Sequence, residues 1–194
     1  MATQERLLDI DAVWELSQQA EYENKRLYLI DGELIVMSPV KRVHSRLANR
    51  IGMFVGMFLE EHDLGEAHTE IGCYPHGDRR TLLAPDVAYF SHASLSQQPE
   101  DGFLSVMPDL AIEIASPSDS LKQLREKAQI YLDNGSRLVW IVLPAEKGVD
   151  VCRAVDGPRL DIEFVPQTGT LTGDDVLPGF ELHMTRLFPI AESS

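Results

Sequence analysis

The sequence has little of what marks a zinc-binding, secreted or membrane protein. Its two cysteines, Cys73 and Cys152, have no spacing typical of metal ligands, so a structural zinc site is disfavoured and both are expected as reduced thiols. No apolar run approaches the roughly 20 residues that a membrane helix needs, and the first residues do not form a signal peptide. We therefore expect a cytoplasmic protein without a membrane partner, folded as a single domain over residues 1–194.

Positive charge is also scarce, because 17 Lys and Arg stand against 31 Asp and Glu and give a net charge of −14. Phosphate binding rests on Lys and Arg, so this composition argues against indiscriminate adhesion to nucleic acid. One basic block is free of acids, and its cations are Lys41, Arg42, Arg46 and Arg50. The three arginines recur every four residues and would form one stripe on a helix. That stripe is either a nucleic-acid footprint or a solvated helix face.

The most informative feature that is present is an acid inside an apolar run. Glu113 stands in residues 110–115, whose composition is typical of a buried strand. An ionised carboxylate there is costly unless it is paired or binds a cation. A second apolar run contains Asp86 directly after a proline. Two short strands with one acid each predict a shared divalent ion. The alternatives are a turn role for Asp86 and a buried ion pair between Glu113 and an arginine.

The periodicities predict an α/β fold, with a mixed sheet and a crossover helix. Asp31-Gly32 between two apolar runs predicts a hairpin over residues 26–37. The last of the expected helices should be capped at its start by Ser118 or Asp119 and end at Asn134-Gly135. Helices are expected at about 11–19, 43–61 and 120–134. Strands are expected at 69–74, 82–90, 110–115 and 137–143, followed by appended antiparallel strands at 149–155, 160–165 and 179–184.

A series of short motifs from about residue 29 to residue 144 carries a family resemblance. They are Ile30-Asp-Gly-Glu33, Met37-Ser-Pro39, His44, Pro85-Asp86, Ile112-Glu113, Ser116-Pro-Ser-Asp119, Lys127, Tyr131, Gly135 and Val139-Trp-Ile-Val-Leu-Pro144. Each motif is weak alone, but their order and spacing are specific. Together they resemble the Uma2 family of endonucleases, which belongs to the PD-(D/E)XK nuclease superfamily. The resemblance implies a restriction-endonuclease-like core and continues weakly to the end of the chain.

The catalytic lysine departs from the superfamily pattern, which places it two residues after the second acid. An alanine stands there. In Uma2-like proteins the lysine is thought to have moved to the following helix, where the matching residue is Lys127. Helical geometry supports this assignment, because Lys127 borders the apolar face beside Leu124 and Tyr131 and could reach inward. Lys122 and Arg125 are expected to be solvated. The alternative is that Lys127 is an ordinary lysine at the edge of an amphipathic helix.

The chemistry that the resemblance implies is metal-dependent hydrolysis of nucleic acid, with DNA as the first expectation. Asp86 and Glu113, with a backbone carbonyl near Ile114, would hold Mg²⁺, for which Mn²⁺ is a possible substitute. Lys127 would orient or deprotonate the attacking water and offset charge on the phosphate.

Two further candidates each have a plain alternative. Glu33 matches the family's hairpin glutamate and could bind the metal through water, or it is an exposed hairpin acid. His44, at the start of the basic helix, could contact the scissile phosphate or the leaving oxygen, or it is a surface or capping residue.

Two other functions stay open at this point. One is a non-catalytic module that binds nucleic acid or a partner on the same fold. The other is a metal-dependent hydrolase of a smaller substrate, which an acidic surface would tolerate better. The resemblance also implies a homodimer.

Overall fold

The computed structural model describes residues 7–23, 25–37, 41–155 and 159–190, so Ser38 and Pro39 of the Met37-Ser-Pro39 motif lie outside the described residues. The helices are α1 (Ile10–Ser17), α2 (Arg42–His62), α3 (His92–Leu95), α4 (Leu121–Asp133) and the 3-10 turn η1 (Met184–Arg186). The strands are β1 (Arg26–Ile30), β2 (Glu33–Met37), β3 (Gly65–His68), β4 (Val87–Ser91), β5 (Leu110–Ile114), β6 (Leu138–Leu143), β7 (Gly148–Ala154), β8 (Leu160–Val165), β9 (Thr170–Gly173) and β10 (Leu177–His183).

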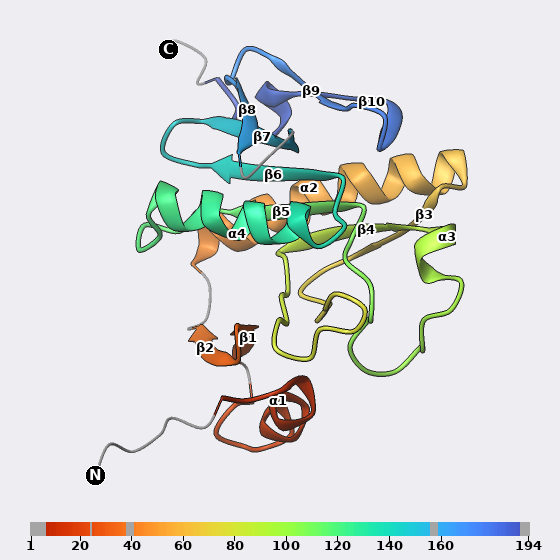
Figure 1. Ribbon diagram of the computed structural model, residues 1–194. Helices are drawn as coiled ribbons and strands as arrows, with labels where there is room; N and C mark the ends of the chain where they lie inside the picture. The colour runs from red at the N-terminus through yellow and green to blue at the C-terminus, as the bar shows by residue number, and fades with distance from the viewer. Residues whose placement is uncertain (1–6, 24, 38–40, 156–158, 191–194) are drawn as a thin grey trace.

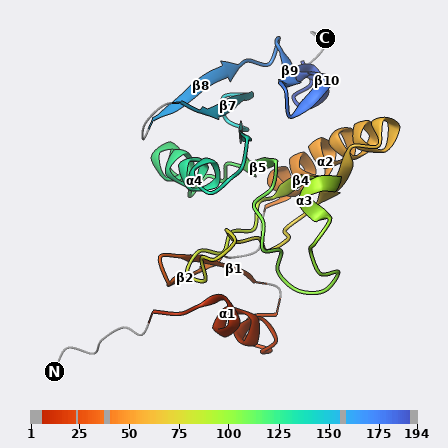
Figure 2. The same cartoon turned by 45° about the vertical axis from the view of Figure 1, so that its right-hand side comes forward.

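A six-stranded mixed sheet in the order β3-β4-β5-β6-β7-β8 forms the centre of the molecule. Its one parallel pair is β5 and β6, which α4 connects, and the other neighbouring strands are antiparallel. Helices α2 and α4 cover opposite faces of this sheet (Figures 1 and 2). The architecture confirms the expected α/β class, with a crossover helix and antiparallel strands toward the end of the chain.

The alternation of side chains along β5 decides which residues face which helix, because successive residues of a strand point to opposite sides. Ile112 packs in the core with Leu47 and Ile51 of α2. Ala111 packs on the other side with Leu124 of α4. Glu113 has the same parity as Ala111, so the strand directs its side chain toward α4.

The hairpin of β1 and β2 is confirmed and lies below the main sheet with α1, at the end opposite β9 and β10 (Figure 1). Its two turn residues, Asp31 and Gly32, have φ values of 52° and 85°, the left-handed backbone that a two-residue hairpin turn requires. Leu29 pairs with Leu82 through two main-chain hydrogen bonds of 2.8 and 2.7 Å. This pairing fixes β1 against the strands that carry the candidate acids.

Two of the expected strands are corrected by the structure. Residues 69–74 form no strand; only Cys73 makes isolated bridges, and the strand nearby is β3. The chain turns at Glu70, whose φ is 56°, so an extended segment cannot continue. The strand expected at residues 82–90 is regular only from Val87, because Pro85 has no N–H to donate to a ladder.

The start of α4 differs from the expectation, although its end agrees. Ser120 is the N-cap, and its hydroxyl accepts a 3.2 Å hydrogen bond from the Gln123 amide while the Gln123 side chain accepts from the Ser120 amide. Asp119, one of the two expected caps, accepts instead from the Ser116 amide at 2.8 Å. At the other end Asn134 is the C-cap. The Ser-x-x-Gln spacing of a capping box was the signal for the correct start.

The two cysteines were expected as reduced thiols, and both are free; the structure adds that both are buried. Lys122 is exposed, also as expected, but Arg125 is not simply solvated, because it holds the buried Asp150 of β7 at 2.7 Å. Strand β9 was not predicted, since its four residues carry no apolar alternation. Among the described residues, none of the helices has the length and apolar character needed to cross a bilayer.

Candidate active site

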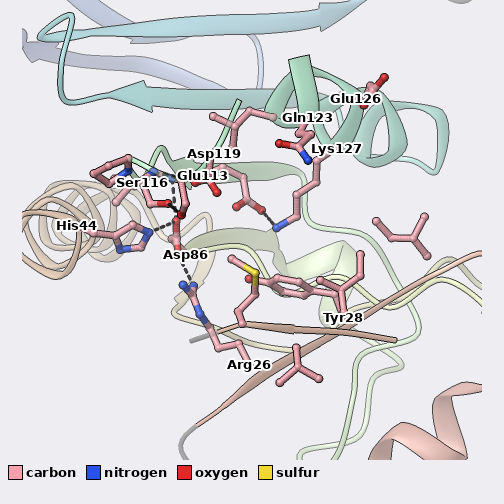
Figure 3. Close-up of a pocket in the computed structure, with 18 of the residues that line it drawn as sticks. Arg26, Tyr28, His44, Asp86, Glu113, Ser116, Asp119, Gln123, Glu126 and Lys127 are labelled. Carbon is pink, nitrogen blue, oxygen red and sulfur yellow. Dashed lines mark hydrogen bonds and ion pairs between the residues drawn. The ribbon is translucent and has the colours of Figure 1, made fainter. Parts of the chain in front are cut away.

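Two neighbouring strands bring Asp86 and Glu113 to one place. The antiparallel register aligns Val87 with Ile112, so Asp86 and Glu113, the next residue of each chain segment, come next to each other. Both are almost fully buried, at 3% and 5% exposure. The main-chain N–H of Ile114 donates to Asp86 Oδ2 at 2.7 Å, which ties the end of one strand to the other. The two side chains point into the same space in Figure 3.

The carboxylate of Asp86 is contacted by two basic side chains from other elements. The Arg26 guanidinium, from β1, donates to Oδ1 in a very close ion pair, and His44 Nε2, from the first turn of α2, lies 3.0 Å from Oδ2. Burial raises the pKa of Asp86, but the hydrogen bond and charge of His44, the charge of Arg26 and the Ile114 amide together lower it below its usual range. Asp86 is therefore held as a carboxylate. His44 Nδ1 is buried and has no hydrogen-bond partner within the described part of the chain.

Glu113 is balanced differently, by two groups of α4. Lys127 Nζ lies 2.7 Å from Oε1, and the Tyr131 hydroxyl donates to the same oxygen at 2.8 Å. Burial raises the pKa of Glu113, the nearby charge of Asp86 adds to this, and together they outweigh the lowering by Lys127 and Tyr131. One of the two acids thus has a raised pKa, as expected for clustered carboxyl groups. A second cation near Glu113 would relieve the remaining electrostatic cost.

Lys127 points inward toward the acids, as the helical geometry predicted, and its side chain is only 15% exposed. Its ammonium group also lies 4.1 Å from the centre of the Tyr28 ring, a cation–π distance. Burial lowers the pKa of Lys127. The interactions with Glu113 and with the neighbouring Tyr28 raise it by more, so the net shift of the pKa is upward. The lysine is a charged donor in this site and not a free base.

These residues lie in a cavity of about 670 Å³ between the hairpin and α4. The acids stand at its base, the loop of residues 116–119 forms one rim, and α4 forms one wall (Figure 3). The hairpin forms the opposite wall, from Tyr28, Ile35 and Met37 among others. The cavity combines a charged end with a long apolar side.

The predicted site residues are only partly brought together. The cavity is lined by Asp86, Glu113, Ile114, Lys127, His44 and Lys41. Glu33 is exposed at the turn of the hairpin, outside this lining. Of the arginine stripe, Arg42 and Arg46 are exposed and Arg50 is half-buried, with its Nε lacking a hydrogen-bond partner in the described residues. Arg46 lines a different, smaller hollow with Lys147 and Phe188.

Sequence reasoning missed Arg26 and Tyr28 as parts of the site. Arg26 is 60 residues from Asp86, and an arginine that opens a strand has no local pattern that predicts such a partner. One signal was available for both residues: the alternation Arg26, Tyr28, Ile30 places them on one face of the hairpin. What could not be read was that this face turns toward Asp86 rather than toward solvent.

The oxygen donors of the cavity can be matched to the divalent cation that the sequence predicts. Among the described residues, no group of three or more His, Cys, Asp or Glu side chains could hold a metal ion. The two carboxylates of Asp86 and Glu113 nevertheless suit Mg²⁺, because this ion is usually bound through one or two carboxylates and keeps several waters. Their oxygen donors fit a hard cation, and thiol ligands are absent from the cavity lining.

The chain is similar to known proteins in both sequence and fold. A family model named Uma2, described as "Putative restriction endonuclease", matches residues 13–185. A crystal structure from Anabaena variabilis, described as "a putative nuclease belonging to DUF820", has a TM-score of 0.75 with 20% sequence identity and covers 93% of this chain and 97% of its own. At that identity the likeness shows a shared fold. No curated protein matches the chain.

Proposed function

The chain belongs to the Uma2 family, a nuclease-like family with a mixed-sheet fold, and from that premise we propose that it is a metal-dependent endonuclease. Its substrate would be the phosphodiester backbone of a nucleic acid, with DNA as the first candidate. The observation that carries this proposal is the meeting of Asp86, Glu113 and Lys127 in one cavity, from three separate elements. A buried set of two acids and a lysine is costly to fold, so a role in chemistry accounts for it better than stability does.

The carboxylates of Asp86 and Glu113, with the main-chain carbonyl of Ile114, would hold Mg²⁺ or Mn²⁺. A divalent ion supplies Lewis-acid polarisation of the phosphate and a water of lowered pKa. The pairing of Val87 with Ile112 keeps the two acids next to each other at the ends of their strands, and the Ile114 amide fixes the orientation of Asp86. The protein's part is thus to present oxygen donors that are already aligned.

Lys127 would act on the reacting phosphate as a fixed cation. Because its pKa is raised, it would hold the attacking water by hydrogen bonding and offset the negative charge that develops on the phosphate. His44, at the opposite side of Asp86, would donate a proton toward the leaving oxygen. Glu33 stays a prediction without a contact to the cavity to support it.

Substrate binding would use the cations at the cavity mouth and beyond it. Lys41 lines the cavity, and the exposed Arg42 and Arg46 continue along α2, with Arg50 one turn further. On a chain of net charge −14, a local basic strip would guide a polyanion to one place and leave the remaining surface repulsive.

The experiment is a nuclease assay on purified protein with Mg²⁺, Mn²⁺ or EDTA, using single-stranded and double-stranded DNA and RNA. Lys127→Met keeps the length of the side chain and removes its charge. It is expected to lower the cleavage rate by about 100-fold or more, in the range of a lost proton-transfer or charge-stabilising group. The matched control is Lys122→Met, on the same helix but solvent-exposed, which should cleave like the wild type. A wild type that cleaves nothing with either ion would end the proposal.

The binding-module alternative is favoured by one observation, that each acid already has a basic partner within the protein. Asp86 already has Arg26 and His44, and Glu113 already has Lys127, so the network is satisfied without a metal. In that reading nucleic acid would bind equally well in EDTA and Mg²⁺ and would never be cut. Metal-dependent cleavage by the wild type excludes it.

A further inference from the structure

The cavity continues beyond the catalytic groups into a part that the proposed chemistry does not use. Its lining also includes apolar residues of the hairpin and of α4: Ile30, Ile35, Val36, Met37, Leu124 and Ile130. A phosphate needs none of these. We call these six residues the apolar chamber.

The hairpin wall of this chamber is built by strand register. Tyr28 stands opposite Ile35, and Arg26 stands opposite Met37, and directly opposed residues of an antiparallel pair share one face. The face that offers Arg26 to Asp86 therefore offers Ile35 and Met37 beside it. Ile35 is 38% exposed, so this wall is open to a ligand.

The charged end of the same cavity identifies what kind of ligand would use the chamber. Four acids, Asp86, Glu113, Asp119 and Glu126, line the cavity together with Arg26, Lys41 and Lys127. Since Arg26 and Lys127 are paired with the first two acids, an anionic group would be bound mainly through Lys41 and the divalent ion. A ligand that fills both ends must join an anionic group to a flat or apolar group over a short distance. In a nucleic acid, each nucleotide does this, because its phosphate is followed by a base with a π-face.

We propose that the apolar chamber takes one nucleobase, unstacked from its neighbours, of the strand whose phosphate lies at the acids. The proposal rests on the proposed function and names its substrate class: a strand that is unpaired at the scissile position. The cavity volume of about 670 Å³ falls within the roughly 300–1,000 Å³ of sites that enclose a small ligand. A base pair inside a continuous stack cannot present one base to such a cavity unless the base is extruded.

Charge supports an unpaired strand over a duplex. Specific duplex binding buries roughly 1,000–2,500 Å² of protein surface that is strongly positive. This chain has 17 cationic side chains against 31 anionic ones, and many cations are already paired, including Arg79, Arg125, Arg137 and Arg153. Contact with a base adds affinity without needing further positive charge.

The test compares an intact strand with one that keeps its phosphates and lacks bases. The probes are a fluorescent 12-nucleotide DNA strand, a strand of the same length that is abasic at every position, and the intact strand in a duplex. Fluorescence anisotropy with full-length wild-type protein in CaCl2 gives affinities, and a gel checks that the probes stay uncut. The intact strand should bind about tenfold or more tightly than the abasic strand, since base stacking is worth ~1–3 kcal/mol per base. It should also bind more tightly than the duplex.

A pair of variants assigns this difference to the chamber. Ile35→Ser should weaken binding of the intact strand by about tenfold and leave the abasic strand within about twofold of wild type, because the abasic strand has no base to lose. The matched control is Ile190→Ser, at a position that is 60% exposed and outside the cavity lining, which should change neither affinity.

The outcomes separate this inference from the proposed function. If abasic and intact strands bind the wild type equally, or if Ile35→Ser weakens both to the same extent, the base-binding chamber is overturned even when the protein is a nuclease. If the wild type neither binds nor cuts any strand in Mg²⁺ or Mn²⁺, the proposed function fails and the chamber fails with it. The comparison of strands uses wild-type protein alone, so it stands even if a variant folds poorly.

Discussion

Single residues in this protein show which buried charges a sequence can reveal and which it cannot. Glu113 and Asp86 were predictable because an acid inside an apolar strand contradicts its surroundings. Lys127 was predictable because its position on α4 follows from helical periodicity and from a family resemblance. Arg26 was not, because the partner of a buried acid is chosen by tertiary packing across 60 residues. The sequence thus indicates where a charge must be compensated but not by which residue.

Arg26 is expected to compete with a divalent ion for Asp86. Its guanidinium contacts Asp86 and lies 3.6 Å from the exposed Glu70, which offers it a second partner. Arg26→Gln should therefore let Mn²⁺ stabilise the fold at roughly tenfold lower concentration, which corresponds to ~1.4 kcal/mol of lost competition. Thermal melts over a Mn²⁺ titration measure this. Arg79→Gln, which removes an exposed arginine paired with Asp11, is the control, and equal Mn²⁺ responses of both variants would refute the competition.

The loss of folding stability at acidic pH should depend on Asp86. Because its pKa is lowered from 3.8 in the folded protein, its contribution is complete above that value and is lost as the pH falls through the depressed pKa. The raised pKa of Glu113 has the opposite effect on stability, since it favours the folded state below pH 4.5 and this contribution is lost as the pH rises.

Urea unfolding of Asp86→Asn between pH 5 and about pH 2 should show a shallower loss of stability than the wild type. Asp101→Asn, in an exposed loop, should keep the wild-type slope; an unchanged slope in Asp86→Asn would contradict the assignment.

At the level of elements, the helices and the hairpin that were predicted correctly are those whose formation depends on neighbouring residues in the sequence. The hairpin followed from Asp31-Gly32, and α2 and α4 followed from their apolar stripes. The strands that were missed or displaced, β3 and β9, are four residues each and exist because a neighbouring strand offers a ladder. Their residues have no periodicity of their own, since pairing and burial set strand preference more than intrinsic propensity does.

The capping box of α4 is expected to stabilise both the fold and the placement of Lys127. Ser120→Ala removes the hydroxyl that accepts from the Gln123 amide and should lower the free energy of unfolding by about 1 kcal/mol. Urea denaturation measures the change. Ser45→Ala, at an exposed position in the first turn of α2, should stay within about 0.5 kcal/mol of the wild type. A loss as large in Ser45→Ala would show that the cap has no special role.

At the scale of the whole molecule, the six-stranded sheet has two edge strands, β3 and β8. Phe164 on β8 is 46% exposed. Exposed apolar edge strands are templates for pairing with another chain, so we propose the homodimer that the family resemblance implied and expect β8 to form it. Light scattering should give twice the mass of one chain, and Phe164→Asp should halve it. Met57→Asp, at an exposed position of α2, should leave the dimer intact, and a wild type that scatters as a single chain would remove this proposal.

The net charge of −14 makes the salt dependence of binding a test of where a polyanion docks. Most of the surface repels phosphates, so the few productive contacts should dominate the slope of log affinity against log salt. Each phosphate contact contributes roughly 0.7 to that slope on a single strand.

If the exposed Arg42 and Arg46 are such contacts, changing both to Gln should lower the slope by about 1.4, measured by anisotropy over a salt series. Changing the exposed Lys122 and Arg159 to Gln removes the same charge elsewhere and should leave the slope unchanged. Equal slopes for the two double variants would show that net charge, and not the α2 strip, governs association, and would return Arg42 and Arg46 to the solvated face of a helix.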